Sequence, residues 1–246
     1  MAIRVVVSGT GKMGTEVVRA LAGEPDMEPA GTLGRSSDPE QFFSQTSADV
    51  VVDFTGGDRA PAVAMAALAA GVRPVIGTSG LKPEFLSQLE SKCREQALGA
   101  VVAPNFALGA VIMMHLAALA GPYFSQAEII EMHHDQKADA PSGTSIATAE
   151  AMAKRRGRPF QRNQPQKENL PGSRSAAIEG VTIHSVRLPG LVAHQEVIFG
   201  APGQALTIRH DSLSRESFMP GVMAAIRWVM DSDQLTIGLD KVLGLE

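Results

Sequence analysis

Short apolar runs alternate with amphipathic stretches over the first hundred residues. The apolar runs are continuous and bounded by Gly, Pro or polar residues, which is typical of strands buried on both faces of a parallel sheet. The amphipathic stretches predict the helices that connect such strands. The expected strands cover 3–8, 28–33, 50–54, 74–76 and 100–103. A first helix is expected to end near 22, and two more are expected over 59–70 and 83–97. The pattern predicts an α/β fold with a Rossmann-like, doubly wound parallel sheet.

The pattern changes after Pro104. Three strand candidates follow one another without helices between them, which favours an α+β unit with a mixed or antiparallel sheet. Its elements are expected at 107–120 (helix), 127–132 (strand), 142–156 (helix) and 181–187, 193–199 and 205–210 (strands), with a polar loop over 158–174. An amphipathic helix over about 214–230 and a short strand at 235–237 are predicted to return to the first domain. We therefore expect one domain over 1–104 and 214–246, which binds a dinucleotide, and a second over 105–213, which binds the substrate.

Composition narrows the class of protein. The 246 residues carry a formal net charge of −4, which argues against a general binder of nucleic acid or of anionic membranes. The apolar run over 99–120 is interrupted by polar and turn-forming residues, which predicts a buried strand, turn and helix rather than a membrane span. The single Cys93 cannot form an intramolecular disulfide, and no signal peptide is recognised at the N-terminus. A cytoplasmic enzyme acting on a small molecule is expected.

A glycine-rich loop follows the first predicted strand. Gly9, Thr10, Gly11, Lys12, Met13 and Gly14 stand where a βαβ unit places the phosphates of a dinucleotide, at the start of a helix. The alternative is a tight turn without a ligand.

The end of the second strand indicates which dinucleotide binds. An NAD site would present Asp or Glu there, but the chain offers Arg35, Ser36 and Ser37, whose donors suit a ribose 2′-phosphate. We predict a preference for NADPH over NADH, with Lys12 as a second phosphate contact. The alternative is a solvated loop that happens to contain an Arg.

Two further turns lie at the carboxyl ends of predicted strands, where open α/β sheets bind their ligands. The first contains Phe54 and Thr55, and the second contains Gly77, Thr78 and Ser79. Both are predicted to line the cofactor site.

The segment from 131 to 145 has a composition that core packing does not require. His133, His134 and Lys137 are poor core residues, and the Pro-Ser-Gly-Thr run at 141–144 predicts a helix start. Free backbone N–H groups there and the Lys137 ammonium could bind two carboxylates, while an imidazole could donate a proton. A zinc site is disfavoured because adjacent His residues do not have helical metal spacing, and neither a Cys nor a third His lies near. An ordinary polar loop is the other alternative.

The segment His-His-Asp-Gln-Lys-Ala-Asp-Ala-Pro-Ser-Gly-Thr over 133–144 resembles the signature of the 4-hydroxy-tetrahydrodipicolinate reductase family, long called dihydrodipicolinate reductase. The resemblance extends to the glycine loop and to 52–55, 77–80, 103–106, 186–196 and 209–212. It implies an enzyme of the diaminopimelate route to lysine that reduces its substrate with NAD(P)H and without a metal. It also implies a homotetramer, domains that close by a hinge, and a C-terminal helix that returns to the first domain.

The resemblance also implies roles for individual residues. His133 is the expected proton donor and Lys137 the expected catalytic lysine, while His134, Ser142, Gly143 and Thr144 bind substrate carboxylates. Pro104, Asn105 and Phe106 join the predicted cofactor residues.

Two features depart from the family pattern. The glycine loop is one residue shorter, and the Arg that often follows the Phe-Thr pair is missing, so Arg59 could take its place. A reductase of another small imino or keto dicarboxylate and a non-catalytic NADPH sensor are the alternative functions.

Overall fold

The computed structural model describes residues 2–78 and 80–245 and divides the chain into two compact units. Unit 1 extends to Leu108 and resumes at Arg215, and unit 2 covers Gly109–Ser214. The predicted boundaries, after 104 and after 213, precede the divisions after Leu108 and after Ser214 by four residues and by one residue.

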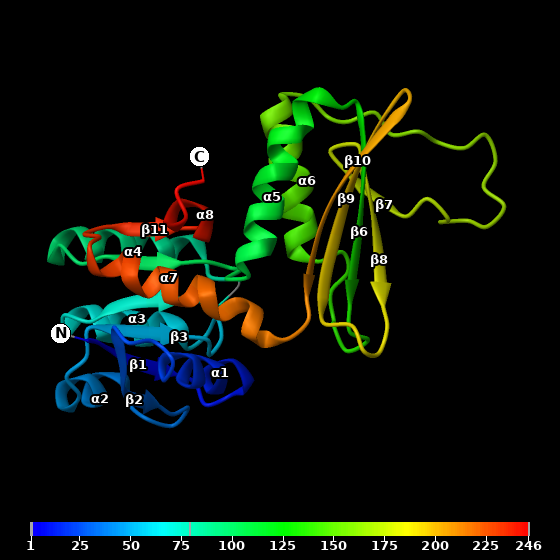
Figure 1. Cartoon of the computed structure of the whole chain (residues 1–246). Coiled ribbons are helices and arrows are strands. Elements are labelled where there is room, and N and C mark those ends of the chain that lie inside the picture. The colour runs from blue at the N-terminus through cyan, green and yellow to red at the C-terminus, as the bar shows by residue number, and fades with distance from the viewer. Residues whose placement is uncertain (1, 79, 246) are drawn as a thin grey trace. The chain divides into compact units, whose positions relative to one another are not determined.

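Unit 1 is built on a six-stranded, all-parallel sheet with the strand order β11-β5-β4-β3-β1-β2 (Figure 1). The strands are β1 (Ile3–Ser8), β2 (Met27–Leu33), β3 (Val50–Asp53), β4 (Arg73–Ile76), β5 (Ala100–Val102) and β11 (Leu235–Ile237). Every residue of β3 is buried, as a central strand covered on both faces requires. The predicted doubly wound sheet is confirmed.

Helices cover both faces of this sheet. They are α1 (Lys12–Leu21), α2 (Pro39–Gln45), α3 (Ala60–Ala69), α4 (Pro83–Gln96), α7 (Met219–Met230) and α8 (Leu239–Val242), with a 3₁₀ turn, η2 (Arg215–Phe218), before α7. Apolar residues of α2, α3 and α4 form two clusters with the strands, and Cys93 is buried in one of them. No helix was predicted over 39–45, although Asp38 caps α2 by accepting a hydrogen bond from the Gln41 N–H at 3.0 Å.

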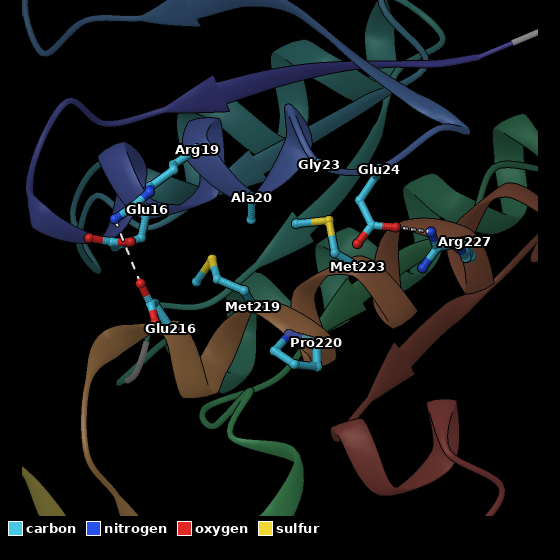
Figure 2. Close-up of a pocket in the computed structure, with 10 residues that line it drawn as sticks. All are labelled: Glu16, Arg19, Ala20, Gly23, Glu24, Glu216, Met219, Pro220, Met223 and Arg227. Carbon is cyan, nitrogen blue, oxygen red and sulfur yellow. Dashed lines mark hydrogen bonds and ion pairs between the residues drawn. The ribbon is translucent and has the colours of Figure 1, made fainter.

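The C-terminal segment completes unit 1. Strand β11 pairs with β5, and α7 contacts α1, β3 and β4. A groove of about 550 Å³ lies between α1 and α7. In Figure 2, Met219 and Met223 extend into it from α7 toward α1. Ion pairs of Arg19 with Glu216 and of Arg227 with Glu24 span the two sides. The predicted return of this segment to the first domain is confirmed.

Unit 2 contains a five-stranded mixed sheet with two helices on one face. Its elements are α5 (Leu108–Ala120), η1 (Gly121–Tyr123), β6 (Gln126–His133), α6 (Gly143–Arg156), β7 (Ala176–Ile178), β8 (Val181–Arg187), β9 (Ala193–Ala201) and β10 (Gln204–Ser212), with strand order β10-β9-β6-β8-β7. Strands β6 and β8 are parallel and the other pairs antiparallel. Residues of α5 and α6 share one apolar core with the sheet. Strand β7 was not predicted.

None of the helices in the described part of the chain is both long and apolar enough to cross a membrane. The very apolar α5 has 13 residues.

Candidate active site

At two positions in the glycine loop of unit 1, the backbone conformation or the space around it allows only glycine. Gly9 has φ +102°, and its N–H donates a hydrogen bond to the Leu33 carbonyl at 3.0 Å. A Cβ on Gly14 would lie 1.9 Å from the Gly9 carbonyl oxygen, so a side chain there would displace the loop. Gly11 is the N-cap residue of α1, and the first N–H groups of that helix lack intrahelical partners. The shortened loop thus retains the close approach and the helix start that a pyrophosphate requires.

A pocket of about 380 Å³ opens beside this loop. Its lining residues come from the glycine loop, the β2–α2 loop and the β3–α3 loop: Gly9, Thr10, Gly11, Arg35 and 54–59. The structure therefore brings together predicted cofactor residues from three separate segments. A dinucleotide can approach the backbone closely here, and Arg35 lies beside that backbone. Both features fit a bound NAD(P)H.

Arg35 and Ser36 are exposed, and the side chains of Arg35 and Lys12 form no hydrogen bond or ion pair within the described residues. The backbone of the Arg35 loop is held differently. The Arg59 guanidinium donates hydrogen bonds to the carbonyls of Gly34 (2.7 Å), Arg35 (2.5 Å) and Ser37 (2.9 Å). This contact between the two loops was not predicted.

Buried Asp53, at the end of β3, links two of the predicted cofactor turns. Its carboxylate accepts hydrogen bonds from the Thr55 N–H (3.1 Å), the Thr55 hydroxyl (2.9 Å) and the Thr78 hydroxyl (3.3 Å). The two threonine hydroxyls are thus used to hold the carboxyl ends of β3 and β4 together. Asp53 acts as a scaffold for this edge of the sheet.

Aromatic packing fixes the neighbouring turn. The rings of Phe54 and Phe106 pack edge to face at 5.7 Å, and a Cβ on Gly77 would lie 2.0 Å from the Phe54 ring. Phe106 is buried, so its ring supports Phe54 rather than lining an open surface. Asn105 accepts a hydrogen bond from the Ala107 N–H at 2.9 Å, and Pro104 is exposed. Ser79 lies outside the described residues.

In unit 2 the predicted proton donor is paired with a buried carboxylate. His133 ends β6, and its Nδ1 lies 2.5 Å from Oε2 of Glu131, whose side chain is fully buried. Arg187 lies beside His133 in the register of β6 and β8, and it donates two hydrogen bonds of 2.8 Å to the Glu131 carboxylate. Neither Glu131 nor Arg187 was predicted from the sequence as a site residue. The detectable signal was an acidic residue at a core-facing position of an apolar strand, two residues before a histidine.

The electrostatics of this cluster define its protonation. Burial raises the pKa of Glu131, but hydrogen bonds from Arg187, Ser185 and His133 together outweigh burial and hold that pKa below its usual value. An ionised Glu131 only accepts hydrogen bonds, so Nδ1 of His133 carries a hydrogen and Nε2 is the nitrogen that can exchange a proton. Burial lowers the pKa of His133; Glu131 opposes this effect, whereas Lys137 and Arg187 reinforce it. Its imidazolium is therefore a stronger acid than that of a free histidine.

The start of α6 differs in detail from the prediction. The helix begins at Gly143 with Ser142 as its N-cap, so Pro141 precedes the cap instead of occupying the first turn. The expected free N–H group at Ser142 was wrong, because this group donates to Oε1 of Glu131 at 3.2 Å. The buried Ser142 hydroxyl accepts a hydrogen bond from the Ser145 N–H, which makes it a cap. Gly143 is exposed and Thr144 half-buried, and their N–H groups belong to the first turn.

Lys137 and His134 complete the segment. The Lys137 ammonium donates to the exposed Asp139 carboxylate at 2.6 Å, and its hydrogen bond lowers the pKa of Asp139. Nδ1 of His134 is buried, and it has no hydrogen-bond partner among the described residues. No group of three or more His, Cys, Asp or Glu in the described part of the chain is arranged to hold a metal ion.

Two family models match the chain. The model of the N-terminus of dihydrodipicolinate reductase matches residues 3–106, and the model of its C-terminus matches residues 109–243. The chain belongs to the dihydrodipicolinate reductase family.

Relatives within this family match over nearly their whole length. The 4-hydroxy-tetrahydrodipicolinate reductase of Dehalococcoides mccartyi is 48% identical, with 99% of each chain covered, and that of Moorella thermoacetica is 46% identical, with 98% of each covered. A dipicolinate-bound dihydrodipicolinate reductase from Paenisporosarcina sp. TG-14 is similar in structure, with a TM-score of 0.89, 41% identity, and 98% of this chain and 99% of that chain covered.

Membership of the dihydrodipicolinate reductase family confirms the predicted class of activity. The chain is an oxidoreductase of the diaminopimelate route to lysine, and its N-terminal half is a nucleotide-binding domain consistent with NAD(P)H. The alternatives of a different imino or keto acid reductase and of a non-catalytic sensor are set aside by this full-length similarity. The roles of individual site residues are a separate question.

Proposed function

We propose that this enzyme reduces 4-hydroxy-tetrahydrodipicolinate to tetrahydrodipicolinate, prefers NADPH, and uses His133 as the proton donor. The observation that supports the mechanism best is the 2.5 Å contact between Nδ1 of His133 and the buried carboxylate of Glu131. It orients the imidazole and leaves Nε2 for the substrate.

Loss of the substrate's 4-hydroxyl together with an adjacent ring hydrogen, as water, gives a conjugated imine. The nicotinamide, when bound, would supply the hydride to this system, and the electrons then enter it. His133 delivers a proton from Nε2 to the substrate carbon that becomes electron-rich. The imidazole can draw its next proton from solvent, because its side chain is 15% exposed. Glu131 stabilises the imidazolium before transfer and keeps Nδ1 protonated after it.

The two substrate carboxylates need separate partners. Lys137 binds one of them after exchanging Asp139 for the substrate, and the first turn of α6 at Gly143 and Thr144 binds the other. His134 supports this site with its unpartnered Nδ1. In this role Ser142 contributes by capping the helix.

The preference for NADPH rests on Arg35. Its exposed guanidinium and the adjacent Ser36 and Ser37 occupy the end of β2, where no carboxylate is present to bind ribose hydroxyls. We expect NADH to be a weaker donor, since it lacks only the 2′-phosphate.

The mechanism is tested with a His133→Ala variant. We expect kcat to fall roughly 10²-fold or more, as for loss of a general acid, with little change in the Kd of NADPH. Unchanged turnover would remove His133 from this role.

We also infer that unit 2 forms a homotetramer through the sheet face that α5 and α6 leave open. No described helix of unit 2 itself covers this face (Figure 1), and the face contains the half-buried side chains of Ile130, Met132 and Ile198. Apolar side chains on an uncovered sheet face are typical of subunit contacts. Light scattering should report a tetramer that Ile198→Asp dissociates, and a monomeric parent protein would contradict the assembly. A cytoplasmic location is inferred as well, supported by the single, buried Cys93.

A further inference from the structure

One side chain of unit 1 holds the loop that carries Arg35. The three carbonyls of Gly34, Arg35 and Ser37 all accept hydrogen bonds from the guanidinium of Arg59, which belongs to the β3–α3 loop. Arg59 is fixed in turn, because its N–H donates to the Gly56 carbonyl at 3.0 Å and it is the N-cap residue of α3. The two loops are thereby joined across the pocket that both of them line.

The Arg59 guanidinium is used largely within the protein. Its two terminal nitrogens donate three hydrogen bonds to the β2–α2 loop, and its buried Nε has no hydrogen-bond partner among the described residues. Within the described residues, this guanidinium donates to backbone carbonyls and not to carboxylates. Its fork of donors matches several carbonyls at once, which a lysine ammonium cannot reproduce in the same geometry.

Arg35 shows the opposite arrangement. Its backbone is held by Arg59, whereas its own side chain is exposed and forms no hydrogen bond with the described residues. Of the two guanidiniums that line the pocket, one is used within the protein and the other is available. This division separates the role of positioning a loop from the role of binding a phosphate.

We propose that Arg59 is a positioning residue for cofactor selection. It holds the backbone of Gly34–Ser37 in the conformation from which Arg35, Ser36 and Ser37 bind the ribose 2′-phosphate, and it does not bind that phosphate itself. This inference rests on the proposed use of NADPH. It also replaces the expectation that Arg59 directly takes the place of the missing Arg after the Phe-Thr pair.

The physical basis is the cost of ordering a loop. Without the three hydrogen bonds, an exposed loop would sample several conformations, and binding would have to select one of them. Affinity for NADPH then falls although no contact to the cofactor is removed. Turnover at saturating cofactor is affected little, because Arg59 does not touch the reacting atoms.

The test measures the Kd of NADPH and of NADH by calorimetric titration for Arg59→Met, Arg59→Lys, Arg35→Met and the double variant Arg35→Met/Arg59→Met. Arg59→Met should raise the Kd of NADPH about tenfold or more and the Kd of NADH less, with kcat within about twofold of the parent. Arg59→Lys should resemble Arg59→Met, because the charge alone does not hold the loop. The double variant should bind NADPH more tightly than the product of the two single effects predicts, because part of the effect of Arg59 passes through Arg35.

Arg162→Met is the matched control. Arg162 likewise donates to two loop carbonyls, those of Arg174 and Ser175 at 2.9 Å each, but it belongs to unit 2. Its loss should leave the Kd of NADPH unchanged. Thermal unfolding of each variant shows whether the folded protein was titrated.

Three results would overturn the inference: parental NADPH affinity in Arg59→Met, parental affinity in Arg59→Lys alone, or multiplying effects in the double variant. The second would show that charge matters rather than the three hydrogen bonds, and the third would make Arg59 an independent phosphate contact. Equal Kd values of NADPH and NADH in the parent protein would instead refute the proposed cofactor preference. The role of Arg59 in holding the β2–α2 loop would still be judged by the Kd of NADPH in the Arg59 variants.

Discussion

Replacing Glu131 by Gln tests how the protein prepares His133. Gln has nearly the same shape as Glu, but it carries no charge and presents an NH₂ group where one carboxylate oxygen accepted hydrogen bonds. In the structure, Oε2 faces both His133 Nδ1 (2.5 Å) and one Arg187 nitrogen (2.8 Å), and Oε1 faces the other Arg187 nitrogen and the Ser142 N–H. The side-chain oxygen of Gln can accept the hydrogen bonds on one of these two sides, but its NH₂ group then faces hydrogen-bond donors on the other side.

The expected magnitudes follow from this geometry. Breaking a buried ion pair costs roughly 3–5 kcal/mol, and we expect the lower end because the Arg187 side chain is 18% exposed. Loss of the carboxylate also removes the interaction that raises the pKa of His133, so this pKa falls further. The imidazolium is then less populated at neutral pH and less well oriented. We expect kcat to fall roughly 10- to 10²-fold, a smaller loss than in His133→Ala.

The assay is the pH dependence of kcat under saturating substrate and NADPH. Because His133 must be protonated to act as the acid, activity falls as pH rises through its pKa, and Glu131→Gln should move this descending limb to lower pH. The matched control is Glu128→Gln on the same strand, since Glu128 also pairs with an Arg and a His, Arg174 and His184. A parental kcat and pH profile in Glu131→Gln would refute the reasoning.

Four further predictions follow from the same structure. Lys137→Ala should raise the KM of the substrate and lower kcat, whereas Asp139→Asn, which frees Lys137, should not raise KM; a parental KM in Lys137→Ala would count against a carboxylate contact. Arg35→Asp should reduce the NADPH-to-NADH ratio of kcat/KM about tenfold or more, and an unchanged ratio would exclude Arg35 from cofactor selection. Gly14→Ala places a Cβ 1.9 Å from the Gly9 carbonyl, so denaturant unfolding should show a loss of roughly 1–3 kcal/mol and titration a weaker NADPH complex. The pKa of Glu131 lies below its ordinary value of 4.5 in the folded protein. The stability that the ionised carboxylate contributes is therefore complete above that value and is lost as pH falls through the folded pKa. Unfolding free energies measured from about pH 7 to about pH 3 should fall less steeply in Glu131→Gln.

Local patterns predicted the secondary structure well where packing dictates the residue type. Strands buried on both faces, such as β3, must be continuously apolar, and the glycine loop must contain Gly14 because the Gly9 carbonyl lies against it. Helix α2 and strand β7 are short, and their apolar residues give too little periodicity to be recognised.

The candidate site was predicted less completely, for a physical reason. His133, Lys137 and the start of α6 lie in one segment, so composition alone points to them. Arg187 lies 56 residues beyond Glu131, and Arg59 lies 24 beyond Arg35. Glu131 meets Arg187 only because β6 pairs with β8, and Arg35 meets Arg59 only because their loops follow nearby parallel strands. A single sequence does not specify such pairing residue by residue.

The central claim is tested most directly by supplying freshly generated product of dihydrodipicolinate synthase and following the oxidation of NADPH and NADH side by side. We expect the purified enzyme to oxidise NADPH with a higher kcat/KM than NADH, and His133→Ala to lose most of this activity. Oxidation of neither cofactor by the folded enzyme would contradict the proposed reaction.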